Sequence, residues 1–173
     1  MVYNDKIIDF FKRHNMYDEK TFKYLQANST MIDYHCNEER AFIGCFYILN
    51  KKEELERLQL NIPYVYDDKT ALINIHEIVH GIEKYSKLGE KFKKDITIET
   101  LPILYEHIFI IESTSSELKR YGKYLDKMIE TSNELEYLFA LKVRLELIKK
   151  YQYNMKKMQK LIKKLSHKYQ NKI

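Results

Sequence analysis

Apolar residues in the first sixty positions form short groups that are separated by polar stretches. Two groups, Ile7–Phe11 and Phe22–Leu25, predict two short helices. A continuous apolar run at residues 41–49 fits a buried strand or a short buried helix, because periodicity does not separate the two at that length. Between Lys51 and Leu60, leucines alternate with charged residues at helical spacing, which predicts a further helix.

The pattern changes around Pro63. Residues 62–66 are expected to be extended, because Pro63 disfavours helix at the preceding residue and Val and Tyr favour strands. A long helix is then predicted, with Asp68 or Thr70 as its cap. It continues to about Gly89, where a glycine suits the end of a helix.

Helical patterns dominate the rest of the chain. Residues 90–99 are expected to form a polar loop or a short strand. Thr100 followed by Pro102 indicates a cap and a first-turn proline, for a helix that reaches about Ser116. Two more helices are expected, over residues 117–129 and about 132–169. The pattern therefore predicts a mainly α-helical fold, with at most a small β-sheet from residues 41–49 and 62–66.

Composition agrees with long helices and a real core. The 173 residues include only 4 glycines and 2 prolines, so few turns are marked, and 45% of the residues are hydrophobic. The formal net charge is +5, and residues 149–173 contain lysines but neither Asp nor Glu. A basic helix of this kind can contact nucleic acid or an anionic membrane, but we expect a solvated helix face.

Targeting signals and disulfides are not expected. The N-terminus enters an amphipathic pattern without the basic start and apolar run of a secretory signal. An uninterrupted apolar stretch of about 18 residues, long enough to span a membrane, does not occur. Cys36 and Cys45 do not make a disulfide framework. The sequence therefore predicts a cytoplasmic protein with reduced thiols.

Two histidines inside an apolar helix carry the candidate chemistry. His76 and His80 are four residues apart, so an α-helix places them about 40° apart on one face. Two imidazoles in that position can converge on one tetrahedral zinc ion. Glu77 follows His76, and its carboxylate can take a proton from a water molecule that the metal activates. The motif His76-Glu77-Ile78-Val79-His80 thus predicts one Zn²⁺ per chain.

A catalytic zinc site needs a third ligand, and Glu106 is the best candidate. Ile103 lies three residues before it and Ile110 four residues after it, which puts the Glu106 carboxylate on an apolar helix face. An ionised carboxylate there is costly unless it is paired or bound to a cation. Glu99 and Glu112 remain alternatives.

Other titratable residues are expected to have other roles. Glu83 shares the histidine face but lies further along the helix axis, which suits a residue that supports a ligand. His107 points about 100° away from Glu106 and is expected at the surface or beside a ligand. Cys36 and Cys45 are expected to be small core residues.

The pattern His76-Glu77-x-x-His80, followed by Glu106, resembles the gluzincin metallopeptidases. Its spacing is closest to the thimet oligopeptidase and oligoendopeptidase F family. The resemblance implies that His76, His80 and Glu106 bind zinc. It also implies that Glu77 is the general base in the hydrolysis of a peptide bond.

The match covers about residues 60–115, and members of that family are several-fold longer. The family usually has glycine where this chain has Val79, and the small size is similar to that of the minimal gluzincins. We therefore expect a compact helical zincin-like domain over residues 1–173. Its expected parts are N-terminal helices with a possible strand in 1–60, a zinc-binding core in 61–116 and C-terminal helices in 117–173.

Two functions follow from this reading. The leading hypothesis is a zinc metallopeptidase whose substrate is a peptide or protein. The alternative is a non-proteolytic zinc-binding interaction or regulatory module that keeps the same site.

Overall fold

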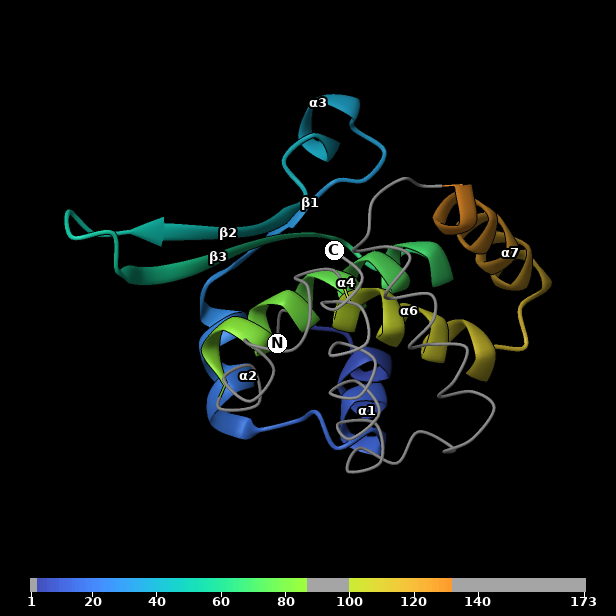
Figure 1. Ribbon diagram of the computed structural model, residues 1–173, viewed down its shortest axis with the longest axis horizontal. Coiled ribbons are helices and arrows are strands. Elements are labelled where there is room, and N and C mark those ends of the chain that lie inside the picture. The colour runs from blue at the N-terminus through green and yellow to red at the C-terminus, as the bar shows by residue number, and fades with distance from the viewer. Residues whose placement is uncertain (1–2, 87–99, 132–173) are drawn as a thin grey trace, which may run out of the picture. The chain divides into compact units, whose positions relative to one another are not determined.

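The computed structural model describes residues 3–86 and 100–131 of the chain (Figure 1). The chain divides into two compact units, Met1–Glu90 and Lys91–Ile173, each of which is described by itself. The single domain expected from the sequence, with its parts at 1–60, 61–116 and 117–173, stays a prediction. The mainly helical character with a small sheet is confirmed for the described residues.

The first unit combines helices with one sheet. Its elements in chain order are α1 (Asp5–Arg13), α2 (Glu19–Ala27), β1 (Ser29–Ile32), α3 (Asn37–Arg40), β2 (Gly44–Leu49), β3 (Leu55–Pro63) and α4 (Asp68–Tyr85). The second unit contributes α6 (Thr100–Glu112) and α7 (Ser116–Thr131). The two short helices predicted near the N-terminus are therefore confirmed as α1 and α2.

Within residues 3–86, three strands form one sheet in the order β1-β3-β2. β1 runs parallel to β3, and β2 runs antiparallel to it, with Cys45 opposite Leu60. β2 occupies the apolar run at 41–49, which settles that ambiguity in favour of a strand. Figure 1 shows the β2–β3 hairpin projecting beyond the helices of this unit.

The helix predicted between Lys51 and Leu60 is wrong, because this segment turns and then enters β3. The Asn50 side chain accepts hydrogen bonds from the backbone N–H groups of Lys52 and Glu54, at 2.8 and 3.0 Å, and holds the turn. In β3 the buried side chains recur at every second position, at Leu58, Leu60 and Ile62. The strand ends at Pro63, so residues 64–66 of the predicted extended segment lie beyond it.

β1 was not predicted, because Asn28-Ser29-Thr30 resembles a loop. Its residues pair with the second half of β3, from Ser29 opposite Leu60 to Ile32 opposite Pro63. Phe10, Phe11 and Phe22 are fully buried in the core under α1 and α2. Burial of these aromatic side chains is a main source of stability in the first unit.

A capping box starts α4. The Asp67 side chain accepts the Thr70 backbone N–H at 2.8 Å, and the Thr70 hydroxyl in turn accepts the Asp67 backbone N–H at 3.1 Å. The predicted start is therefore correct to within one residue, with Asp67 rather than Asp68 as the cap. The described helix ends at Tyr85, and Gly89 lies outside the described residues.

The second unit follows its predicted helices closely. α6 begins at Thr100 and ends at Glu112, short of Ser116, which instead begins α7. A Cβ atom added to Gly122 would lie 2.9 Å from Cγ2 of Ile110, so the glycine allows α7 to approach α6 closely. The expected helix over 132–169 and the segment 90–99 lie outside the described residues. Among the helices that are described, none is long and apolar enough to cross a membrane.

Candidate functional site

His76 and His80 face each other on the middle turns of α4. Their Nε2 atoms are 3.1 Å apart, and the ring centroids are 4.8 Å apart with an interplanar angle of 70°. The His80 side chain is buried, with 7% of its surface exposed, and His76 is half-buried. The two rings thus converge through their outer nitrogens in a largely desolvated place.

This separation suits a shared metal ion. Two nitrogen ligands at 2.0–2.1 Å from a tetrahedral zinc lie about 3.3 Å apart. The observed 3.1 Å between the two Nε2 atoms is within a few tenths of an ångström of that spacing. Without a metal, the same contact is a hydrogen bond in which one ring N–H donates to the other ring, and the tautomers decide the donor. The spacing of the two nitrogens is therefore compatible with a shared zinc ion.

A buried amide anchors α4 to the sheet. The Nδ2 group of Asn74 donates to the carbonyl of Pro63 at 2.9 Å and to that of Thr70 at 3.0 Å. Only 1% of the Asn74 surface is exposed. The sequence does not reveal this role of Asn74, because a hydrogen bond to the end of β3 leaves no trace in local spacing. This bond fixes where the histidine helix meets the sheet.

The two sides of α4 have different neighbours. On one side, the Tyr85 ring stacks on Tyr24 of α2 with centroids 3.8 Å apart, and a Cβ on Gly81 would lie 2.8 Å from Cδ2 of Leu25. On the other side, the Lys84 ammonium lies 4.6 Å from the centre of the Tyr47 ring in β2.

The histidine pair belongs to the β2 side of α4. His80 is four residues before Lys84, so their side chains are about 40° apart around the helix. His76 lies a further 40° around the helix in the same sense. The pair therefore lies on the flank of α4 toward the antiparallel edge strand, not on the flank that packs against α2.

The Cys45 thiol of β2 is influenced by the charge of Glu77, which belongs to the His76–His80 motif. Burial raises the pKa of the Cys45 thiol from 9.0 to about 12, and the negative charge of Glu77 is the second cause. Lys84 acts in the opposite direction, and Glu83 adds to the increase. Both cysteines are free and half-buried, so the expectation of small core residues holds only in part. The thiol is protonated at neutral pH and lies near the predicted general base.

The predicted third ligand is in the other unit. Glu106 lies on α6 and is half-buried between buried neighbours, and Glu112 is exposed. Glu99 lies outside the described residues. His107 is only 4% exposed, which excludes the surface position, and the alternative of a position beside a ligand stays a prediction. Because each unit is described by itself, the role of Glu106 as a ligand stays a prediction.

Among residues 3–86 and 100–131, no group of three or more His, Cys, Asp or Glu side chains is arranged to hold a metal. His76 and His80 are therefore a pair of candidate ligands in the described structure. A hollow of about 690 Å³ occurs elsewhere in the first unit, near the C-terminal end of α4. Ile82, Tyr85 and Ser86 contribute to its wall, but none of the predicted site residues does.

Comparisons with known proteins give no further guidance. No family model, no curated protein and no solved structure matches this chain.

Proposed function

We propose that this protein is a zinc-dependent metallopeptidase. His76 and His80 bind the metal, Glu106 is the third ligand, and Glu77 is the general base. The observation that carries the proposal is the 3.1 Å separation of the two histidine Nε2 atoms, which matches the separation of neighbouring ligands around zinc.

Each residue has a defined task in this proposal. The neutral imidazoles of His76 and His80 hold the ion, and their burial keeps bulk water from competing for it. Zinc, when bound, polarises the substrate carbonyl and lowers the pKa of water. The Glu77 carboxylate takes the proton from the attacking water and delivers it to the leaving amine. The charge of Glu77 acts on Cys45 of β2, so its carboxylate lies on the β2 side of the helix, where a substrate bound at the sheet edge would lie.

The edge of the sheet supports a peptide as substrate. In the part of the chain that the structure describes, β2 pairs with β3 and with no other strand. Its sequence, Gly44-Cys-Phe-Tyr-Ile-Leu49, contains neither charge nor proline, the usual protections of an edge strand. An extended peptide can add to such an edge through main-chain hydrogen bonds. The bound peptide would then pass the flank of α4 that carries the histidines.

Metal analysis and turnover test the proposal together. The full chain, purified without chelators, should contain about one zinc ion per molecule, and His76→Ala and His80→Ala should each lose it. Cleavage of a peptide library should fall by roughly 10²–10⁴-fold in Glu77→Gln, because the general base is removed. Zinc should remain bound in that variant.

Glu19→Gln is the control, since Glu19 is an exposed glutamate in the first turn of α2 and has no part in the proposed site. It should retain both zinc and turnover. Absence of zinc from the native protein, with unchanged stability in His76→Ala, would refute the zinc site. Zinc with equal background cleavage in wild type and Glu77→Gln would instead favour the non-proteolytic binding module.

Two related expectations remain predictions. The chain is expected in the cytoplasm, and the basic residues 149–173 are expected to form a solvated helix face. Retention of the full chain on heparin at increasing salt tests the second, because binding through several lysines would weaken steeply with ionic strength.

A further inference from the structure

Four aromatic side chains gather at the end of the sheet where β1 and β3 finish. Tyr34 and His35 follow β1, and Tyr64 and Tyr66 follow β3. Ring centroids are 6.4 Å apart for Tyr34 and His35, 5.0 Å for His35 and Tyr66, and 6.1 Å for Tyr64 and Tyr66. We call these four residues the aromatic platform.

The platform is exposed rather than part of the core. Tyr64 and Tyr66 have 48% and 53% of their surface exposed. They are separated by Val65, and their ring centroids are 6.1 Å apart, so the two rings lie beside each other. A contiguous group of exposed aromatic side chains marks an interaction surface, because nothing in the core requires it.

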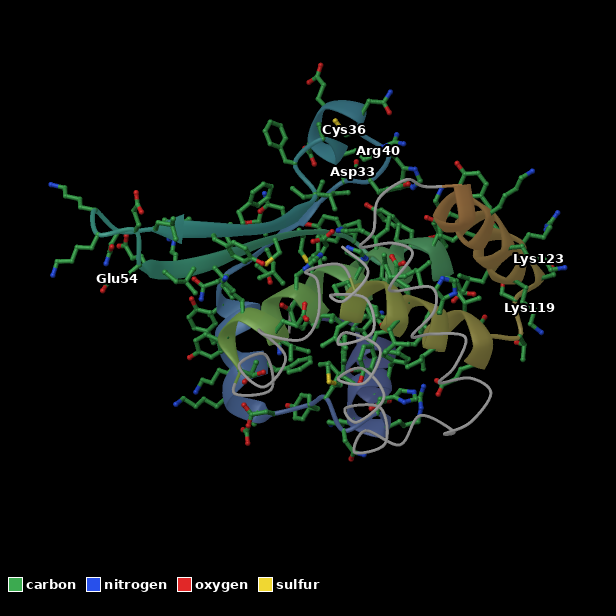
Figure 2. The ribbon with its side chains drawn as sticks, viewed as in Figure 1. Asp33, Cys36, Arg40, Glu54, Lys119 and Lys123 are labelled. Atoms are coloured by element: carbon green, nitrogen blue, oxygen red, sulfur yellow. The ribbon has the colours of Figure 1, made fainter. Side chains whose placement is uncertain are left out.

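Cations of the chain itself already sit on the platform. The Arg40 guanidinium carbon lies 4.8 Å and the Lys69 ammonium 5.8 Å from the centre of the Tyr34 ring. Both distances are within the range of a cation–π interaction. Figure 2 shows Arg40 and Asp33 near α3, and Glu54 far from them at the tip of the hairpin. The platform therefore has the electrostatic character that positive side chains prefer.

Carboxylates strengthen this preference. Asp33 accepts the backbone N–H of His35 at 3.0 Å, and its own backbone N–H donates to Glu39 at 2.8 Å. The Tyr66 hydroxyl lies close to the Asp33 carboxylate. Partial desolvation, followed by the negative charge of Asp33, raises the pKa of Tyr66. Asp33 and Glu39 are the charges that act on Tyr66, whereas Arg40 and Lys69 lie over the Tyr34 ring, so a cationic ligand is favoured at Tyr66.

The platform lies at one end of the edge strand. Gly44, the first residue of β2, is opposite Asn61, and Tyr64 is three residues further along the chain. At about 3.3 Å per residue, that is roughly 10 Å. An extended peptide that pairs with β2 and leaves it at the Gly44 end would thus reach the rings within a few residues.

We propose that the aromatic platform binds a lysine or arginine side chain of an extended peptide that pairs with β2. The assumption that the ligand is a peptide depends on the proposed peptidase function. The preference for a cation depends only on the rings and the carboxylates. The exposed faces of Tyr64 and Tyr66 would hold the cationic group. Asp33 would supply the opposite charge.

Matched peptides test the preference. Fluorescence anisotropy should be measured for the full chain carrying Glu77→Gln, so that peptides stay intact. Extended eight-residue peptides carry one lysine at successive positions, and their controls carry acetyl-lysine at the same position. For at least one position, the lysine peptide should bind about two- to five-fold more tightly, as expected for an exposed cation–π contact.

Variants assign the preference to the platform. Tyr64→Ala combined with Tyr66→Ala should abolish it, while Tyr64→Phe, which keeps the ring, should retain it. Tyr124→Ala removes a tyrosine that is 61% exposed on another element and should have no effect. Equal or undetectable binding of both peptide series would overturn the proposal, as would a preference that survives the double variant. Absence of cleavage by the wild type, with the preference intact, would count against the peptidase alone.

Discussion

Replacing Asn74 with alanine should destabilise the first unit by about 1–3 kcal/mol. The substitution removes both donors of the buried amide. The Thr70 carbonyl still accepts the helical hydrogen bond from the backbone N–H of residue 74, four residues later. This carbonyl is therefore not left unsatisfied. The Asn74 Oδ1 atom has no hydrogen-bond partner among the described residues, so nothing is lost there. The expected loss therefore comes from the buried carbonyl of Pro63, which loses its donor at 2.9 Å. Leaving a buried acceptor unsatisfied costs about 1–3 kcal/mol.

Urea unfolding of the full chain, followed by circular dichroism, measures the loss. Hydrogen exchange should show where it acts, since opening should become easier in α4 and at the end of β3. The control is Asn61→Ala, because Asn61 lies on the same strand but only accepts a 3.2 Å bond from Gln59. It should change stability by less than about 0.5 kcal/mol.

Two outcomes would refute the reasoning about Asn74. One is an Asn74→Ala variant as stable as Asn61→Ala. The other is a loss of stability of the expected size while the protection of α4 against hydrogen exchange stays unchanged. Either would mean that the amide does not anchor the histidine helix to β3.

Asp67→Ala should cost about 1 kcal/mol in urea unfolding, because it removes the cap of α4. The Thr70 backbone N–H lowers the pKa of Asp67 below 3.8, so this stabilisation is complete above about pH 4. It should be lost as the pH falls through the lowered pKa, and Asp67→Asn should keep the cap without that pH dependence. With a thiol pKa of about 12 instead of 9.0, Cys45 should react with iodoacetamide at pH 8 about a thousandfold more slowly than an ordinary thiol. Glu77→Gln should speed that alkylation, and an unchanged rate would contradict the placement of Glu77 beside β2.

Helices were predictable from the sequence because their signals are local. The periodicity of α1, α2, α6 and α7 and the cap of α4 each lie within one element. The same holds for the meeting of His76 and His80, since any helix brings residues four apart to one face. A motif of this kind predicts its own geometry.

Strands were less predictable because pairing partners are distant in sequence. Leu55, Leu58 and Leu60 are separated by three and two residues, so their spacing suits a helix in one half and a strand in the other. The choice is made by β1 and β2, which pair with the two sides of this segment. Tertiary pairing thus overrides the local preference, as is common for strands.

The neighbours of the motif depend on contacts of the same distant kind. Asn74 and Cys45 gain their roles from Pro63 and Glu77, which lie 11 and 32 positions away along the chain. A spacing rule that looks within one helix does not find such partners. The proposed third ligand, Glu106, poses the same problem, because it lies on an element of the other unit.

Different parts of the structure therefore support the proposed metal and the proposed substrate. A pair of histidines four residues apart supports a metal wherever the helix lies, so the motif alone says little about a substrate. What favours a peptide is the position of the pair on the flank of α4 that faces β2. That flank is defined by two contacts, Lys84 on Tyr47 and Glu77 near Cys45. Because an uncharged edge strand offers main-chain donors and acceptors on the side of α4 that carries Lys84 and Glu77, the case for hydrolysing peptides rests on the sheet, and the case for zinc rests on the helix.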